Sequence, residues 1–285
     1  MISPVALTDM GQDFTEYIKT DMKLYHDSRR SFIKSVALGS LSAMIIPDLL
    51  SHSTMDLSGV KASDGKGLTI LFQGDSITDG NRGRNYNDLN HIMGHGYAFS
   101  IASRLGAAYP EKNLKFINRG ISGNKVNDLS DRWEKDTLDL SPGVLSILVG
   151  INDSASVVFQ REPIISIEKY EEIYNSLLVQ TKEKFHDIIV ILCEPFILPV
   201  GKVKDNFKEY TADLRERQLI VRNLATKHNA VFVGLQAVFN KACERASSEY
   251  WMWDGVHPTV AGHELITREW MNKAGRRLKF IKYRN

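Results

Sequence analysis

Short apolar runs alternate with longer amphipathic segments along the chain from Leu68 onward. Five of these runs are almost continuously apolar, as strands covered on both faces of a sheet must be, because neither face is left for polar side chains. A strand followed by an amphipathic segment, repeated several times, is typical of βα units and a parallel sheet. The predicted strands are residues 68–73, 114–118, 144–149, 188–193 and 230–233.

The segments between these runs carry apolar residues at helical spacing. In segment 166–185, for example, Tyr170, Tyr174 and Leu177 fall on one helical face, which indicates packing against a sheet rather than a cofactor site. Helices are predicted at 96–108, 166–185, 208–228, 235–246 and 260–280. Five strands with intervening helices predict the α/β class, as a three-layer α/β/α sandwich around a five-stranded parallel sheet.

The first 62 residues do not follow this alternation. Their longest uncharged apolar stretch, residues 35–47, is shorter than the roughly 20 residues that span a bilayer. It follows the segment SRRSFIK at positions 28–34, which resembles the twin-arginine export signal. We therefore expect residues 1–62 to be an export signal and leader cleaved after Ala62, and residues 63–285 to be one domain.

Two alternatives stay open for this leader. Translation from Met22 gives a more compact basic leader, and an amphipathic helix with solvated arginines is the plain structural explanation of the same residues. If the export signal is genuine, the mature protein is periplasmic or secreted by a bacterium and has no stable membrane anchor.

Composition narrows the range of functions. The chain has 36 Lys+Arg against 34 Asp+Glu, a net charge of +2 and no basic run interleaved with aromatic residues, so no nucleic-acid surface is expected. Its two cysteines, Cys193 and Cys243, are too few for a disulfide framework or a thiolate zinc site, and whether they pair is open. CxxC and HExxH spacings are absent from the sequence, and we predict neither a metal site nor a cofactor.

Polar side chains follow three of the predicted strands, where an open α/β sheet binds its ligands. Ser76 lies in GDSITDG after the first strand, Gly120 in NRGISGN after the second, and Asn152 in GIND after the third. Near the C-terminus, WDGVHP places Asp254 three residues before His257, close enough to hold one imidazole nitrogen protonated while the other acts as a base. Each string alone is ordinary turn chemistry.

In combination and in this order, the four strings resemble the blocks of the SGNH hydrolases, also called the GDSL esterase/lipase family. The resemblance covers residues 68–280 and implies a flavodoxin-like sandwich. It also implies that Ser76 is a nucleophile, His257 its general base and Asp254 the group that orients His257. The oxyanion donors would be the Ser76 and Gly120 N–H groups and the side-chain amide of Asn152.

Other polar and aromatic residues near these strings receive supporting roles. Asp75 and Asp153 are expected to shape their loops rather than to act on substrate. The histidines beside the motifs are expected to be surface or loop residues: His91, His95 and His263. Trp133, Trp251 and Trp253 are candidates for an aromatic platform under a sugar ring, with packing against the sheet as the alternative.

The absence of an apolar insertion between the blocks favours a short acyl group such as acetyl. Export together with this scaffold resembles bacterial carbohydrate O-acetylesterases. The sequence therefore predicts a serine esterase that hydrolyses acetyl esters of carbohydrates through an acyl-enzyme. The alternatives are a periplasmic lysophospholipase or thioesterase and a catalytically silent carbohydrate-binding protein. Binding alone has no need of a serine with its base, which disfavours the silent protein.

Overall fold

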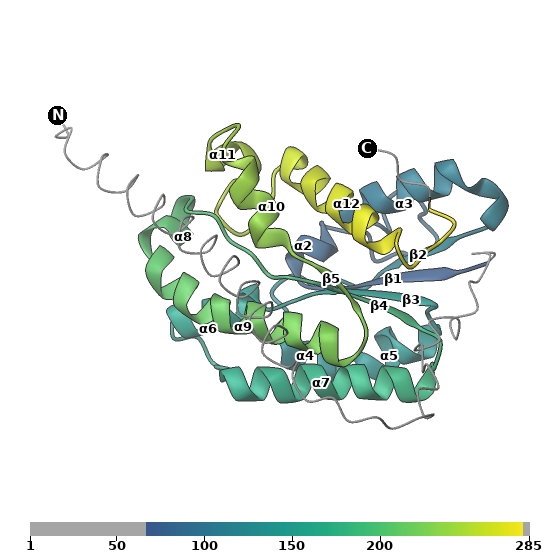
Figure 1. Ribbon diagram of the computed structural model, residues 1–285, viewed down its shortest axis with the longest axis horizontal. Helices are drawn as coiled ribbons and strands as arrows, with labels where there is room; N and C mark the ends of the chain where they lie inside the picture. The colour runs from purple at the N-terminus through teal and green to yellow at the C-terminus, as the bar shows by residue number, and fades with distance from the viewer. Residues whose placement is uncertain (1–66, 282–285) are drawn as a thin grey trace, which may run out of the picture. The chain divides into compact units, whose positions relative to one another are not determined.

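The computed structural model describes residues 67–281, so the predicted leader lies outside the described residues (Figure 1). Five parallel strands form one sheet in the order β2-β1-β3-β4-β5. This order is flavodoxin-like, and it confirms the predicted fold class. Each strand lies within one residue of its predicted bounds: β1 Thr69–Gly74, β2 Lys115–Asn118, β3 Val144–Leu148, β4 Ile189–Cys193 and β5 Val231–Val233.

Helices cover both faces of the sheet (Figure 1). One face carries α3 (Tyr97–Ala108), α10 (Leu235–Ala242) and α12 (Val260–Ala274). The opposite face carries α4 (Val126–Asp131), α5 (Trp133–Asp136), α7 (Ile167–Lys184) and α9 (Phe207–Lys227). The connections contain α2 (Ser76–Asp79), α6 (Ile151–Val158), α8 (Gly201–Asp205), α11 (Ser248–Trp251) and the short 3-10 turns η2 (Pro110–Lys112) and η3 (Leu138–Leu140).

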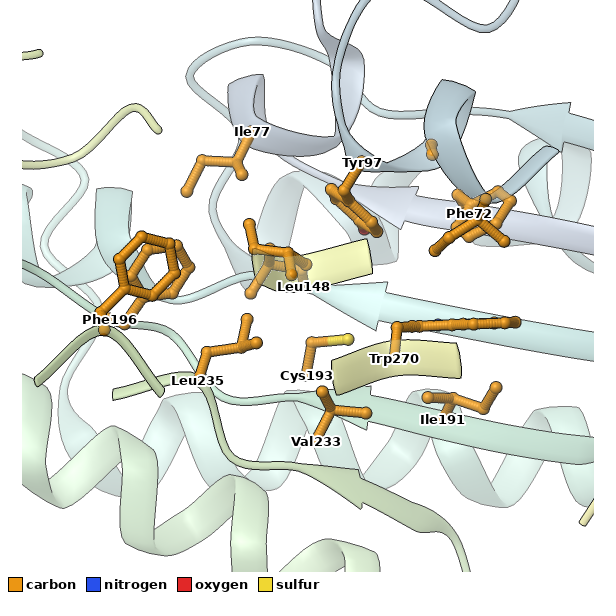
Figure 2. Packing of buried hydrophobic residues seen from close by; sticks show 14 of the residues in the cluster. Phe72, Ile77, Tyr97, Leu148, Ile191, Cys193, Phe196, Val233, Leu235 and Trp270 are labelled. Atoms are coloured by element: carbon orange, nitrogen blue, oxygen red, sulfur yellow. The ribbon is translucent and has the colours of Figure 1, made fainter. Parts of the chain in front are cut away.

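Alternate strand residues supply the two layers of the core. Phe72 of β1 faces α3 and α12, whereas its neighbour Leu71 faces the opposite layer. Phe72 packs against Trp270 of α12, and the two ring centroids are 5.8 Å apart. Figure 2 labels both side chains in this layer of the core. The Trp270 indole donates to Ser146 Oγ at 2.9 Å, so the polar atom that this large side chain buries has a partner.

Two helices end earlier than predicted. The helix predicted over 235–246 ends at Ala242, and the chain then turns into the short helix α11. The helix predicted over 260–280 ends at Ala274, and Gly275 follows it. Glycine is a poor helix former, and here the Leu278 N–H returns to the Ala274 carbonyl at 2.8 Å in a closing turn.

Both cysteines are free thiols. Cys193 is buried in β4, and this burial raises the pKa of its thiol to about 12, so it remains protonated. Within residues 67–281, no helix is both long and apolar enough to cross a bilayer.

Candidate active site

Ser76 stands at the first position of α2, directly after β1. Gly74 makes this sharp turn possible: its φ is +152°, and a Cβ there would lie 2.2 Å from the Leu148 carbonyl oxygen. Asp75 caps α2, because its Oδ1 accepts the Ile77 N–H at 2.9 Å. The turn closes at Gly80, whose N–H returns to the Ser76 carbonyl at 3.0 Å. The serine hydroxyl is thus presented from a buried backbone turn.

Asp254 and His257 arrive on a loop between α11 and α12. Asp254 Oδ1 accepts the N–H groups of Val256 at 2.9 Å and His257 at 2.7 Å, so the carboxylate folds its own loop. Gly255, with φ +92°, docks this loop on the segment after β4, and its carbonyl accepts the Leu198 N–H at 3.1 Å. The local DxxH spacing therefore forms a compact, carboxylate-centred turn.

The structure brings the three predicted catalytic side chains together. Ser76 Oγ lies 2.8 Å from His257 Nε2, and His257 Nδ1 lies 2.7 Å from Asp254 Oδ2. The hydrogen bond to Asp254 raises the pKa of His257, partly against the effect of burial. Burial opposes ionisation of Asp254, but its hydrogen bonds from His257 and Val256 outweigh this and lower its pKa. The pair therefore favours a charged carboxylate beside an imidazole that readily takes up a proton.

Asn152 lies near the start of α6, at the carboxyl end of β3. Its side-chain Nδ2 donates one hydrogen to the Asn124 carbonyl at 3.1 Å. An amide group carries two hydrogens, so the second remains for a ligand. The contact also joins the loop after β3 to the loop after β2, from which a second oxyanion donor was predicted.

Gly120 does not serve as that second donor in this geometry. Its N–H is donated to Asn118 Oδ1 at 2.9 Å, and the residue is buried. A Cβ at Gly120 would lie 2.3 Å from the Asp79 nitrogen, so glycine is needed there for close packing against α2. The prediction placed the donor on the wrong glycine of NRGISGN, because the side chain that occupies the Gly120 N–H cannot be identified from the local pattern.

Gly123, in the same loop, has an N–H that is open to a ligand. Ile121 to Asn124 form a turn closed by an N–H to carbonyl bond of 3.1 Å, with Gly123 at its third position and φ +84°. Such a turn needs glycine there, and it leaves the N–H of its central peptide unused. Within residues 67–281, the Gly123 N–H has no acceptor. The sequence signal was present, since Ile-Ser-Gly-Asn is a typical turn of this kind.

Asp75 and Asp153, which adjoin Ser76 and Asn152 in the chain, are both buried. Burial raises the pKa of Asp75 to about 7 and that of Asp153 to about 6. Asp153 Oδ1 accepts the Val126 N–H at 3.2 Å and so ties α6 to α4, whereas Asp75 caps α2. These contacts suit the loop-shaping roles expected from the sequence.

The tryptophans separate into two kinds. Trp253 is 68% exposed, and its ring centroid lies 6.0 Å from that of His257. Trp251 is buried and donates its indole N–H to the Ala246 carbonyl, and Trp133 is buried against Thr181 of α7. Only Trp253 of these three therefore fits the predicted platform, and the other two pack the fold.

The histidines near the motifs also differ. His91 and His95 lie exposed in the loop before α3, as predicted. For His263 the prediction of a surface or loop position is wrong, because it lies buried on α12, where its Nδ1 accepts the Tyr97 N–H at 3.2 Å. Burial lowers the pKa of His263 to about 4, so it is a neutral cap for α3.

Among the described residues, no group of three or more His, Cys, Asp and Glu side chains is placed to hold a metal ion. The chemistry available at this site is that of a serine with a carboxylate-oriented base, beside loops that carry the Gly123 N–H and the Asn152 amide. That arrangement suits acyl transfer through a covalent intermediate.

Comparisons with known proteins agree with this geometry. Residues 72–265 match the GDSL-like Lipase/Acylhydrolase family. The chain is 36% identical over 215 residues to an acetylxylan esterase of Geobacillus stearothermophilus, and the match covers 74% of this chain and 95% of that protein. It is 27% identical over 155 residues to the uncharacterised lipoprotein YqeF of Bacillus subtilis, covering 48% of this chain and 60% of the relative.

Solved structures show the same likeness. A protein described as a GDSL-like lipase from Parabacteroides merdae superposes with a TM-score of 0.70 at 39% identity, covering 74% of this chain and 96% of that one. The G. stearothermophilus acetylxylan esterase superposes with a TM-score of 0.67 at 33% identity, covering 77% and 99%. Catalytic mutants of that esterase replace a serine, an aspartate or a histidine by alanine, and its aspartate and histidine are three positions apart, as are Asp254 and His257.

Proposed function

The chain belongs to the GDSL-like lipase/acylhydrolase family and is a carboxylic ester hydrolase, and on that premise we propose that it removes acetyl groups from carbohydrates. The main support for the mechanism is the chain of hydrogen bonds from Ser76 Oγ to His257 Nε2, 2.8 Å apart, and from His257 Nδ1 to Asp254 Oδ2, 2.7 Å apart. The substrate class rests on the similarity to an acetylxylan esterase that covers nearly the whole of that relative.

In the first half of the reaction, Ser76 Oγ forms a bond to the acetyl carbonyl carbon while His257 Nε2 takes the hydroxyl proton. Asp254 holds the proton on Nδ1, so Nε2 is the nitrogen left to accept. The tetrahedral intermediate then collapses with cleavage of the bond between the carbonyl carbon and the sugar oxygen. His257 returns its proton to that oxygen, and the sugar leaves as an alcohol.

In the second half, water attacks the acetyl-serine, and His257 again takes the proton and delivers it to Ser76, releasing acetic acid. Both halves pass through an oxyanion. We assign its donors as the N–H groups of Ser76 and Gly123 and the remaining amide hydrogen of Asn152. One such donor is typically worth about 3 to 4 kcal/mol in the transition state.

Trp253 supplies the second argument for a carbohydrate. A large aromatic side chain that is 68% exposed beside the base offers an apolar face on which a sugar ring can stack. Its ring is tilted 33° from the His257 ring, with the two ring centroids 6.0 Å apart, so it lies beside the base. A pyranose ring stacked on Trp253 would present a neighbouring acetyl group to Ser76.

Acyl length and sugar specificity test this proposal together. We expect hydrolysis of 4-nitrophenyl acetate well above that of the decanoate, and release of acetate from acetylated xylo-oligosaccharides. Trp253→Ala should raise KM for the oligosaccharide and leave KM for 4-nitrophenyl acetate nearly unchanged, because only the sugar needs the platform. A preference for the decanoate would instead support a lysophospholipase or thioesterase. Equal KM changes on both substrates would remove the platform role.

We also propose that the protein is exported. The support is the segment SRRSFIK followed by an apolar stretch, in residues outside those described. N-terminal sequencing of protein from the periplasm or medium of an expressing bacterium should read from Ser63, and replacement of Arg29 and Arg30 by lysine should retain the protein in the cytoplasm. An intact N-terminus confined to the cytoplasm would contradict export.

A further inference from the structure

Asp79, the last residue of α2, is a buried carboxylate with more hydrogen bonds than a helix end requires. Its Oδ1 accepts from the Arg82 N–H at 3.1 Å and from Arg84 Nη1 at 2.9 Å. Its Oδ2 accepts from Arg84 Nη2 at 2.8 Å and from both the N–H and the hydroxyl of Ser122, at 3.1 and 3.0 Å. Only 3% of its side chain is exposed. The carboxylate therefore has no capacity left for a ligand.

These bonds join two parts of the site. Asp79 belongs to the same four-residue helix as Ser76. Ser122 lies in the turn that carries Gly123 and the Asn124 carbonyl, and that carbonyl accepts the Asn152 amide. The turn that locates two of the assigned oxyanion donors is therefore fastened to the nucleophile's own helix through one carboxylate.

Alternate residues of the chain leaving β2 reinforce this contact. Asn118 Nδ2 donates to the Thr78 carbonyl at 2.7 Å, and Gly120 packs against the Asp79 backbone. Ser122 follows at the same spacing of two and reaches the Asp79 side chain. In an extended chain, the side chains of successive residues point in opposite directions, so residues two apart lie on the same side. Asn118, Gly120 and Ser122 therefore all face α2. Of these contacts, only the one at Ser122 is charge-assisted.

We propose that Asp79 is a positioning residue of the esterase, whose carboxylate fixes the turn 121–124 relative to Ser76 so that the Gly123 N–H and the Asn152 amide meet the oxyanion. The proposal rests on the proposed function. Displacing a catalytic group by about 1 Å can lower the rate roughly a hundredfold, so loosening the contact between Asp79 and Ser122 should lower kcat. Arg84 compensates the buried charge through two parallel hydrogen bonds.

The proposal predicts a particular kinetic pattern. Oxyanion contacts form in the transition state, so loosening the turn lowers kcat and leaves KM nearly unchanged. Asp79→Asn places an amide N–H against the Ser122 or Arg84 donors, and we expect kcat on 4-nitrophenyl acetate to fall about 10- to 100-fold. Ser122 is exposed, and Ser122→Ala keeps the backbone hydrogen bond to Asp79, so we expect its kcat to fall about 3- to 10-fold. Ser122→Thr keeps the hydroxyl as well, and its kcat should stay within about twofold of the parent value.

A boronic acid inhibitor forms a tetrahedral adduct with a serine. Its Ki, measured per active site, therefore reports on the oxyanion contacts and separates their loss from a general loss of folded protein. Its Ki should rise by the same factor by which kcat/KM falls in the Asp79 and Ser122 variants, with active sites counted by the nitrophenol burst. Asp139→Asn is the matched control, because Asp139 is exposed and contacts only Lys184 among the described ion pairs. It should leave kcat, KM and Ki unchanged.

Several results would overturn the proposal. Unchanged kcat in a folded Asp79→Asn protein would do so, as would a fall in kcat without any rise in the boronate Ki. If Asp79→Asn does not fold, the contrast between Ser122→Ala and Ser122→Thr decides alone, and equal kcat values for the two would refute the positioning role. A Ser76→Ala protein that still hydrolysed the ester would instead refute the proposed function, so the two failures are distinguishable.

Discussion

The nucleophile turn (residues 74–80) and the base loop (residues 252–258) place their side chains by different means. In the nucleophile turn every residue except Ser76 is buried, and a Cβ at Gly74 or Gly80 would overlap neighbouring backbone atoms. In the base loop, roughly a third of the His257 side chain is exposed, and three hydrogen bonds to Asp254 orient the loop, in addition to the close packing of Gly255 against the segment after β4. The nucleophile is fixed by backbone packing, whereas the base also depends on one carboxylate, so substitutions in the two should fail differently.

Ser76→Ala should have the largest effect on turnover. Loss of the attacking oxygen in a serine hydrolase removes about 10⁴- to 10⁶-fold in kcat. The turn itself is held by Gly74, Asp75 and Gly80, so Tm should stay within about 3 °C of the parent protein, given the modest net contribution of one partly buried hydrogen bond. Measuring kcat on 4-nitrophenyl acetate and Tm on the same preparation checks both the loss of turnover and the retention of the fold. A large fall in Tm would show that the hydroxyl is structural.

Asp254→Asn, in the base loop, should lower kcat nearly as much as Ser76→Ala does. An asparagine Oδ1 still accepts the Val256 and His257 N–H groups, so the loop should persist, but the side chain no longer holds the proton on His257 Nδ1. We expect kcat to fall about 10⁴-fold at neutral pH, as happens when the imidazole takes the wrong tautomer. A loss below about tenfold would mean that Asp254 does not orient the base.

Asn152→Ala should have an intermediate effect. Removing one oxyanion donor costs about 10²- to 10³-fold in kcat, with KM nearly unchanged because the bond forms in the transition state. Steady-state kinetics on 4-nitrophenyl acetate separate the two constants. A rise in KM with constant kcat would show that Asn152 binds ground-state substrate instead.

Paired glycine substitutions test, through protein stability, whether backbone packing fixes the nucleophile turn. Gly74→Ala would place a Cβ 2.2 Å from the Leu148 oxygen, so we expect a loss of about 3 kcal/mol in the free energy of unfolding. At Gly123 a Cβ meets open space, and only the positive φ is strained, which should cost about 1 kcal/mol. Urea unfolding of both variants gives the values. Equal losses would contradict the view that tight packing fixes the nucleophile turn.

Asp75→Asn should have the smallest effect, on pH dependence. His257 must be neutral to accept the serine proton, and the ionised fraction of Asp75, whose own pKa burial raises to about 7, contributes to raising the pKa of His257. An uncharged asparagine lowers that pKa, so the acid limb of kcat/KM moves to lower pH while the rate above the limb is retained. A profile of kcat/KM from about pH 5 to 9 for parent, Asp75→Asn and the Asp139→Asn control measures it. A shift to higher pH would reverse the assigned sign.

The features that sequence reasoning located are those carried by local pattern. Five apolar runs specified five strands, because burial on both faces leaves no polar positions. The spacing of Asp254 and His257 allowed their pairing, since their hydrogen bonds form within one turn, but each string alone is ordinary turn chemistry. Ser76, Asp254 and His257 received their catalytic roles through the resemblance of the four strings, in their order, to the SGNH hydrolases, and the glycine before Asp75 is what the close approach to Leu148 requires.

The features that it missed depend on contacts between distant segments. Gly120 and Gly123 stand three residues apart, and what separates their roles is the Asn118 side chain that occupies the Gly120 N–H. Trp251 and Trp253 are equally good platform candidates by position, but only the fold buries Trp251. His263 is buried because Gly96 allows α3 to approach it closely. The local sequence contains the turn signal at Gly123, but it contains neither the partner of the Gly120 N–H nor the burial of Trp251 and His263.

Labelling with a fluorophosphonate, followed by peptide mass spectrometry, tests most directly whether Ser76 is a nucleophile activated by His257. We expect one phosphonyl group per chain, located on the peptide that contains Ser76, with no labelling of Ser76→Ala and greatly slowed labelling of His257→Ala. Phosphonylation at a different serine, or labelling of Ser76→Ala at the parent rate, would contradict it.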